Sequence, residues 1–151
     1  MTTINLTTEI KAPIERCFDV SRDVELHQVS AEGTSERIVA GRTKGLCELN
    51  DEITWEAVHF GIRQRLSVKI VAMNRPYSFT DTMIKGTFKS ICHEHTFEEQ
   101  NGMTFMKDIF MYEVPFGFIG KLFDMLVLKR YMTSFLVTRN AILKSYVEKG
   151  A

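Results

Sequence analysis

The side chains best suited to chemistry are two histidines and an aspartate in neighbouring stretches of alternating sequence. His93 and His95 are two residues apart, so on a β-strand both imidazoles point to the same face. Asp108 is predicted to lie opposite His95. A carboxylate beside an imidazole can hold its tautomer and raise its basicity, so His95 and Asp108 form a candidate catalytic acid–base pair. Two buried polar groups that only satisfy one another are the structural alternative.

The predicted pairing of these two residues rests on a turn. Asn101-Gly102 favours a two-residue hairpin in which both turn residues have positive φ. Gln100 then faces Met103, and counting back from the turn places His95 opposite Asp108. The alternation of apolar residues selects the same inward positions on both strands, so two observations agree on the register.

A second carboxylate is predicted near the two histidines. A turn at residues 85–87 sets Asp81 opposite Ile91, which also points Asp81 inward. The two imidazoles together with His59, Asp81 or Asp108 resemble the ligand set of a zinc site. Side chains two residues apart on a strand are about 6–7 Å apart, however, which is too wide to share one ion without help. We therefore predict no metal and no cofactor.

Other inward positions could contact a small molecule. His59, Gln64 and Tyr112 could form hydrogen bonds with a ligand carbonyl or hydroxyl group, or equally with bound water. Methionine side chains would give deformable walls, although ordinary core packing explains any single methionine. The apolar residues predicted to line the same space are Trp55, Leu66, Phe79, Ile91, Phe110, Met125, Met132 and Leu136.

The elements that must position these side chains follow from a change of period at Pro115. From about Thr54 to Val114 apolar and polar residues alternate, as in strands, and from Phe116 to Glu148 they repeat at helical spacing. Before that region the pattern predicts a strand, two short helices, a break at Glu32-Gly33 and another short strand. The predicted elements before Pro115 are strands at 3–11, 36–40, 53–60, 62–73, 77–84, 88–99 and 103–114, and helices at 13–20 and 23–29.

The last helix carries one stripe that should face the sheet. With Met125 as the origin and 100° per residue, the stripe contains Phe118, Leu122, Lys129, Met132, Leu136, Arg139, Leu143 and Val147. Arg139 on this stripe needs a carboxylate, from Asp81, Asp108 or a ligand. Ile119, Phe123 and Val127 lie on the reverse side, and we expect the two small helices, a second subunit or a membrane surface to cover them.

Composition limits the class of protein. The 151 residues suit one domain, residues 1–151, and 19 basic against 19 acidic side chains give no field that attracts nucleic acid or anionic lipid. Three scattered cysteines without a CxxC motif favour a reducing compartment, so we predict a cytoplasmic location. The first residues lack signal-peptide features and no apolar run spans a bilayer, which predicts a soluble protein without stable membrane insertion.

The order of elements resembles the helix-grip fold of the START-like superfamily, also called SRPBCC. The residues that carry the resemblance are His59-Phe60-Gly61, Gly86-x-Phe88 leading into His93-x-His95-x-Phe97, and Val114-Pro115-Phe116-Gly117. They are similar to the small bacterial branch of polyketide cyclase/dehydrase-like proteins, and the superfamily also includes the birch pollen allergen type. The resemblance implies an α+β fold in which a seven-stranded curved antiparallel sheet surrounds a long C-terminal helix, with a cavity between them.

Three functions remain open on these observations. The leading hypothesis is a protein that binds or carries a hydrophobic small molecule such as a lipid, a quinone or a polyketide-like compound. The second is a polyketide cyclase or dehydrase that uses His95 as base and Asp108 to orient it. The third is an interaction module, for instance a homodimer, that uses the apolar reverse side of the last helix.

Overall fold

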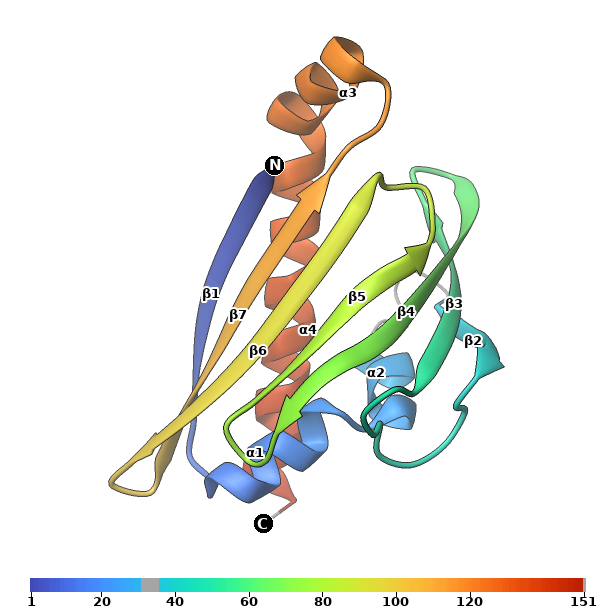
Figure 1. Cartoon of the computed structure of the whole chain (residues 1–151). Helices are drawn as coiled ribbons and strands as arrows, with labels where there is room; N and C mark the ends of the chain where they lie inside the picture. Colours follow the sequence, from blue (N-terminus) through green and yellow to red (C-terminus); the bar gives the residue numbers. More distant parts are fainter. Residues whose placement is uncertain (31–35, 151) are drawn as a thin grey trace.

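Seven antiparallel strands form one curved sheet, and a long C-terminal helix lies along its concave face (Figure 1). The structure is a computed structural model and describes residues 1–30 and 36–150, so the predicted break at Glu32-Gly33 lies outside the described residues. The strands are β1 (Thr2–Ile10), β2 (Arg37–Gly41), β3 (Glu52–His59), β4 (Ile62–Asn74), β5 (Ser78–Lys85), β6 (Ser90–Gln100) and β7 (Met103–Glu113). Their order in the sheet is β1-β7-β6-β5-β4-β3-β2.

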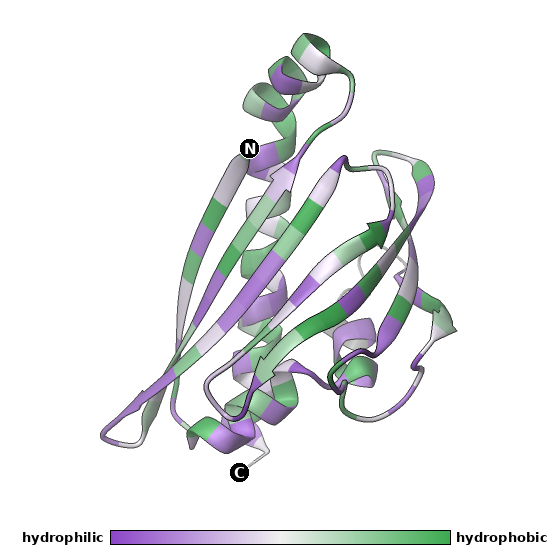
Figure 2. Ribbon diagram, in the orientation of Figure 1, coloured by the Kyte–Doolittle hydropathy of each residue, from purple (hydrophilic) through white to green (hydrophobic). Residues whose placement is uncertain are grey.

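Helices α1 (Ile14–Ser21) and α2 (Val24–Ser30) follow β1, as the sequence predicts, and they contact the C-terminal helix. They lie at the end of the molecule where the chain terminates (Figure 1). Hydrophobic and hydrophilic residues alternate along the strands (Figure 2), so one face of the sheet is available for a core. Phe18 of α1 packs there against two phenylalanines of the sheet. Its ring centroid lies 5.6 Å from that of Phe79 and 5.5 Å from that of Phe97.

The hairpin at Asn101-Gly102 has the predicted register. Asn101 and Gly102 have φ of +54° and +79°, Gln100 pairs with Met103, and His95 pairs with Asp108. The structure confirms this part of the prediction because the turn type alone sets the alignment of the two strands.

The predicted register between β5 and β6 is wrong by two residues. Asp81 pairs with His93 instead of Ile91, because the connection is centred on Thr87 instead of Gly86, and the last paired residues of the ladder are Thr82 and Cys92. Phe88 lies in this connection, ahead of β6, and packs against Tyr112 with ring centroids 5.3 Å apart. A shift of two residues keeps every side chain on its face, so Asp81 still points inward.

The C-terminal helix consists of α3 (Gly117–Phe123), a π-helical turn η2 (Asp124–Leu128) and α4 (Lys129–Lys149). A π-helical turn is wider than an α-helical one, so side chains before it are rotated relative to an unbroken α-helix. The predicted stripe is therefore confirmed for Leu136, Leu143 and Val147, which are buried. It is wrong for Phe118, Leu122, Met125 and Lys129, which are exposed, and Met125 does not line the inner cavity described below.

Asp124 in the π-helical turn fixes the helix to the sheet. It is buried and accepts hydrogen bonds from the hydroxyl groups of Tyr112 on β7 and Thr2 on β1. Tyr112 is completely buried, its hydroxyl group donates to Asp124, and it does not line the central cavity, which favours the structural role over the ligand contact. The inward-facing tyrosine instead joins the outer strands to the start of the long helix.

This anchor can be tested by removing a single hydroxyl group. Tyr112→Phe keeps the ring but leaves the buried Asp124 carboxylate with one donor fewer, so the free energy of unfolding should fall by about 1–3 kcal/mol. Tyr77→Phe, at an exposed tyrosine, is the matched control and should change it by less than about 0.5 kcal/mol. Urea denaturation measures both, and equal stability of the two variants would contradict the anchoring role of Asp124.

Candidate functional site

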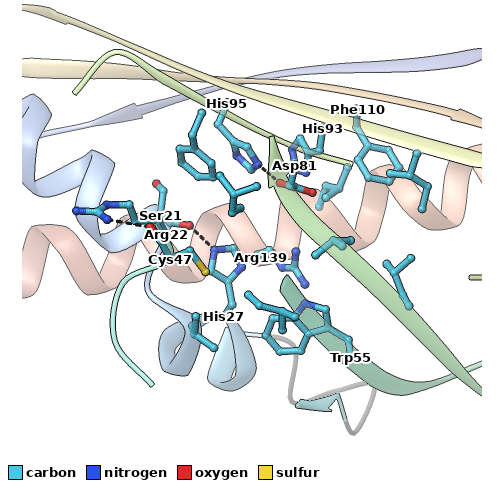
Figure 3. Close-up of a pocket in the computed structure, with 18 of the residues that line it drawn as sticks. Ser21, Arg22, His27, Cys47, Trp55, Asp81, His93, His95, Phe110 and Arg139 are labelled. Carbon is cyan, nitrogen blue, oxygen red and sulfur yellow. Dashed lines mark hydrogen bonds and ion pairs between the residues drawn. The ribbon is translucent and has the colours of Figure 1, made fainter. Parts of the chain in front are cut away.

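An inner cavity of about 150 Å³ lies between the sheet and the middle of α4 (Figure 3). Its wall is mostly apolar, with Asp81, His93 and His95 on the side of the sheet and Arg139 on the side of α4. Of the predicted site residues, those that line it are Trp55, Leu66, Phe79, Asp81, Ile91, His93, His95, Phe110, Met132, Leu136 and Arg139. The predicted inward faces of β3 to β7 therefore meet around one space.

Four ionisable side chains form a connected cluster beside this cavity. His95 Nε2 is 2.9 Å from Asp81 Oδ2, and His93 Nε2 is 2.7 Å from Asp108 Oδ1. His95 Nδ1 is 3.5 Å from Asp108 Oδ1, and Asn140 on α4 donates a hydrogen bond of 2.7 Å to Asp108 Oδ2. We call Asp81, His93, His95 and Asp108 the His/Asp cluster.

The predicted pair of His95 and Asp108 is present only as a longer contact. The shortest bonds of the cluster are diagonal: Asp81 lies opposite His93 but bonds His95, and Asp108 lies opposite His95 but bonds His93. Diagonal neighbours on antiparallel strands are within reach of long side chains. The direct partner of His95 is therefore Asp81, and Asp108 lies behind the cavity wall with Asn140.

Electrostatics favour two charged carboxylates and a neutral His93. Burial opposes ionisation of Asp108, but hydrogen bonds from His93 and Asn140 outweigh it and lower the pKa to about 2. The pKa of Asp81 is also lowered, because the hydrogen bond with His95 and the nearby imidazoles outweigh its burial. Burial and the neighbouring His95 lower the pKa of His93, which keeps it neutral at pH 7.

The cluster also has donor atoms close enough together to bind one metal ion, which the sequence did not predict. Donor atoms of Asp81, His93 and His95 lie within 4.8 Å of one another, because the two imidazole rings tilt together with centroids 3.8 Å apart. The estimate of about 6–7 Å for strand neighbours is therefore too wide for these side chains. A bound cation would have to replace the present hydrogen bonds between these imidazoles and carboxylates.

Arg139 lines the opposite wall and has a different partner from the predicted ones. Its Nη2 donates to Glu36 Oε1 at 3.2 Å, and its guanidinium carbon lies 4.8 Å from the ring centroid of Phe135. The Nε–H group of Arg139 is buried and has no hydrogen-bond partner among the described residues. A buried donor of this kind requires an acceptor from water or a ligand.

A second hollow, the outer groove, lies at the N-terminal end of α4 and has a volume of about 480 Å³. His59 and Gln64, predicted as ligand contacts in the central space, line this groove instead of the inner cavity. The hydroxyl group of Tyr131 is 2.5 Å from His59 Nδ1, and Gln64 Nε2 donates to the carbonyl oxygen of His59 at 3.2 Å. Phe88 and Met132 line both hollows, so the two spaces are neighbours.

Sequence reasoning missed several residues of the site. Asn140 lies four residues after Leu136 on the buried stripe of α4, so helical spacing alone could have identified it. His27 on α2 also lines the inner cavity, and burial lowers its pKa to about 3, so its ring is neutral. No signal in the sequence connects His27 or Glu36 with residues so far along the chain.

Comparison with known proteins supports the fold. No protein-family model matches the chain, and no curated protein matches its sequence. Among solved structures, TTHA0849 from Thermus thermophilus superimposes with a TM-score of 0.81 at 18% identity, covering 99% of both chains. The ginseng major latex-like protein 151 from Panax ginseng has a TM-score of 0.68 at 15% identity, covering 96% of both chains.

Ara h 8.0201 is a further structural neighbour, with a TM-score of 0.64 at 15% identity over 95% of this chain and 98% of its own. At such identities the likeness shows the fold alone. The chain therefore has an α+β helix-grip fold, as its resemblance predicts.

The His/Asp cluster predicts a pH-dependent loss of stability. The folded pKa of Asp108, about 2, lies below its unfolded value, so its stabilising effect is complete above about pH 5 and is lost as the pH falls toward 2. Asp108→Asn should lower the free energy of unfolding by about 2–4 kcal/mol at pH 7, because the amide cannot accept from both His93 and Asn140. The difference from wild type should shrink steadily below about pH 4.

Urea unfolding at several pH values measures this difference. Glu98→Gln removes an exposed carboxylate from the same hairpin and is the control, for which we expect almost no change at any pH. If the Asp108→Asn variant is as stable as wild type at pH 7, the hydrogen bonds of Asp108 do not contribute to the free energy of unfolding.

Proposed function

We propose that this protein binds and carries an amphipathic small molecule, with its polar group in the inner cavity and its apolar part extending toward the outer groove. The observation that carries the proposal is the buried Nε–H of Arg139, which lacks a partner among the described residues and belongs to a side chain that lines the cavity. A cavity with apolar walls and a few convergent polar groups is the usual form of a small-molecule site.

The sizes of the two hollows limit the ligand. The inner cavity of about 150 Å³ is below the usual range for a complete ligand, about 300–1,000 Å³, and suits a single ring or a compact head group. The outer groove of about 480 Å³ can hold a larger apolar part. Because Phe88 and Met132 line both spaces, a rotation of these two side chains would join them.

The charges of the inner cavity favour a neutral polar group. Arg139 already pairs with Glu36, and the ionised Asp81 would repel a carboxylate. A carbonyl or hydroxyl oxygen can accept from Arg139 Nε, and a hydroxyl group can donate to Asp81. Lipids, quinones and polyketide-like compounds that carry such groups are therefore the ligand classes we favour.

The cysteines agree with a reducing compartment, which is part of the proposal. Cys17, Cys47 and Cys92 are all free thiols. Burial raises the pKa of Cys47 to about 12, so this thiol, which lines the inner cavity, stays protonated and unreactive.

The proposal predicts that filling the inner cavity weakens ligand binding. Val68→Phe places a larger ring into the cavity from β4 and should lower the affinity for the fluorescent apolar probe N-phenyl-1-naphthylamine by about tenfold or more. Val71→Phe, at an exposed position three residues further on the same strand, should leave it unchanged. Fluorescence titration measures the affinity, and circular dichroism checks that both variants fold.

Two results would count against a carrier. One is a wild-type protein that does not bind the probe and contains no small molecule when purified from its own host. The other is equal probe binding by the Val68→Phe variant, which would place the probe elsewhere on the protein.

An acid–base enzyme is the second candidate, because His95 lies between two carboxylates on the wall of the cavity. Asp81 accepts from His95 Nε2 and can orient the ring, but Nδ1, the atom left to accept a proton, lies 3.5 Å from Asp108 behind the cavity wall. The imidazole would therefore have to rotate before it could act as a base on a substrate in the cavity. A cyclase or dehydrase acting on a poly-β-keto substrate needs a base of this kind.

The enzyme hypothesis predicts a loss of turnover by about a hundredfold or more in His95→Gln. Asp81→Asn should lower turnover less and shift its pH profile, since it acts through His95. Glu98→Gln, exposed on β6, is the control with unchanged turnover. If His95→Gln converts poly-β-keto substrates as fast as wild type does, His95 is not a base and the carrier hypothesis alone remains.

A further inference from the structure

We propose that the end of the molecule formed by α3 and η2 docks on the surface of an anionic lipid bilayer, where the outer groove can receive an apolar ligand. We call residues 116–127 the apolar tip. The transfer of ligand rests on the proposed function, whereas docking rests on the composition and exposure of the tip itself.

The apolar tip exposes large hydrophobic side chains to an unusual extent. Phe116 is 83% exposed, Phe118 79% and Ile119 75%, and Met125 and Leu126 are also mostly exposed. Single exposed apolar residues are common on soluble proteins, but a contiguous group marks a surface that binds something. Figure 2 shows this end of the helix projecting beyond the sheet.

The two small helices do not cover the exposed side chains of the tip. The small helices were one predicted cover, but α1 and α2 contact α4 at the opposite end of the molecule (Figure 1). Phe18 of α1 belongs to the same core cluster as Leu143 and Val147, near the end of α4. The prediction that these helices shield the start of the long helix is therefore wrong.

The charges around the tip select its partner. Between residues 116 and 131 the exposed charged side chains are Lys121, Lys129 and Arg130, and Asp124, the single acidic residue there, is buried in its bonds to Tyr112 and Thr2. A zero net charge over the whole chain thus conceals a local excess of positive charge. Two tips facing each other would bring these cations together, whereas anionic head groups would neutralise them.

An apolar face with a basic border is typical of peripheral helices that lie in the membrane interface. Within the described residues, no helix is sufficiently long and hydrophobic to span a bilayer. The structure therefore favours shallow insertion of the tip over integral membrane anchoring.

The tip is continuous with the route to the site. Phe116, Gly120 and Phe123 line the outer groove from the tip, and Phe123 packs against Phe60 with ring centroids 5.6 Å apart. Phe88 lies deeper and lines both hollows. A tip inserted among lipids would open the groove toward the hydrocarbon region, which is where an apolar ligand dissolves.

Vesicle flotation tests the docking directly. Wild type should float with vesicles of phosphatidylcholine containing about 30 mol % phosphatidylglycerol, and binding should weaken with added salt. Binding to pure phosphatidylcholine should be weaker. The double variant Phe118→Asp/Ile119→Asp should lower the bound fraction about tenfold, because two exposed apolar groups are replaced by anions. Tyr77→Asp, exposed at the turn between β4 and β5, is the control that should bind normally.

A triple variant, Lys121→Gln/Lys129→Gln/Arg130→Gln, separates charge from hydrophobicity and should lose the preference for anionic vesicles. The proposal is overturned if wild type binds neither kind of vesicle, or if Phe118→Asp/Ile119→Asp binds as wild type does. It is also overturned if light scattering shows a dimer that this double variant dissociates while vesicles capture no protein, since the tip would then join two copies.

Probe binding in solution distinguishes this proposal from the proposed function. The double variant should bind N-phenyl-1-naphthylamine as wild type does, because both substitutions lie outside the two hollows. Vesicle binding without probe binding would support the docking surface and contradict the carrier.

Discussion

The fold must provide hydrogen-bond partners for four ionisable side chains that lie inside an apolar space. Asp81, His93, His95 and Asp108 come from three adjacent strands, and each accepts or donates a hydrogen bond across to a neighbouring strand. Because a buried carboxylate without such a partner is costly, the cluster favours one register of β5, β6 and β7. Asn140 extends the same network to α4, so the helix is also tied to the sheet at this level. The polar wall of the inner cavity is therefore part of the structural framework as well as the candidate site.

The two ends of the long helix meet different surroundings. Its C-terminal half packs on α1 and the sheet, around Phe18, Leu143 and Val147. Its N-terminal end passes beyond the sheet and is held there by Asp124, through Tyr112 and Thr2. The inner cavity lies between these two ends of the helix, and the outer groove lies near its N-terminal end. The apolar tip with its basic border therefore lies next to the outer groove, and the His/Asp cluster lies next to the inner cavity. The proposed passage of an amphipathic molecule from the tip to the inner cavity requires this order.

Local signals in the sequence predict much of this arrangement, and contacts between distant residues explain the rest. Asn101-Gly102 determines the β6–β7 register, because the backbone of the turn leaves no other alignment. The β5–β6 register was missed by two residues since the connection is centred on Thr87 instead of Gly86, and no strong turn signal such as Asn-Gly marks that position. Met125 was placed inward on the assumption of an unbroken α-helix, which the π-helical turn at Asp124 invalidates. The partner of Arg139 is Glu36, 103 residues away, and no spacing rule could have found it.

The most direct test is a crystal structure of the protein with the molecule that accompanies it from its own host. We predict a carbonyl or hydroxyl oxygen within hydrogen-bond distance of Arg139 Nε, close to Asp81, and an apolar part that passes Phe88 and Met132 into the outer groove. A molecule bound wholly outside the inner cavity would contradict it. So would a protein without any bound molecule whose inner cavity is filled by the side chains that line it.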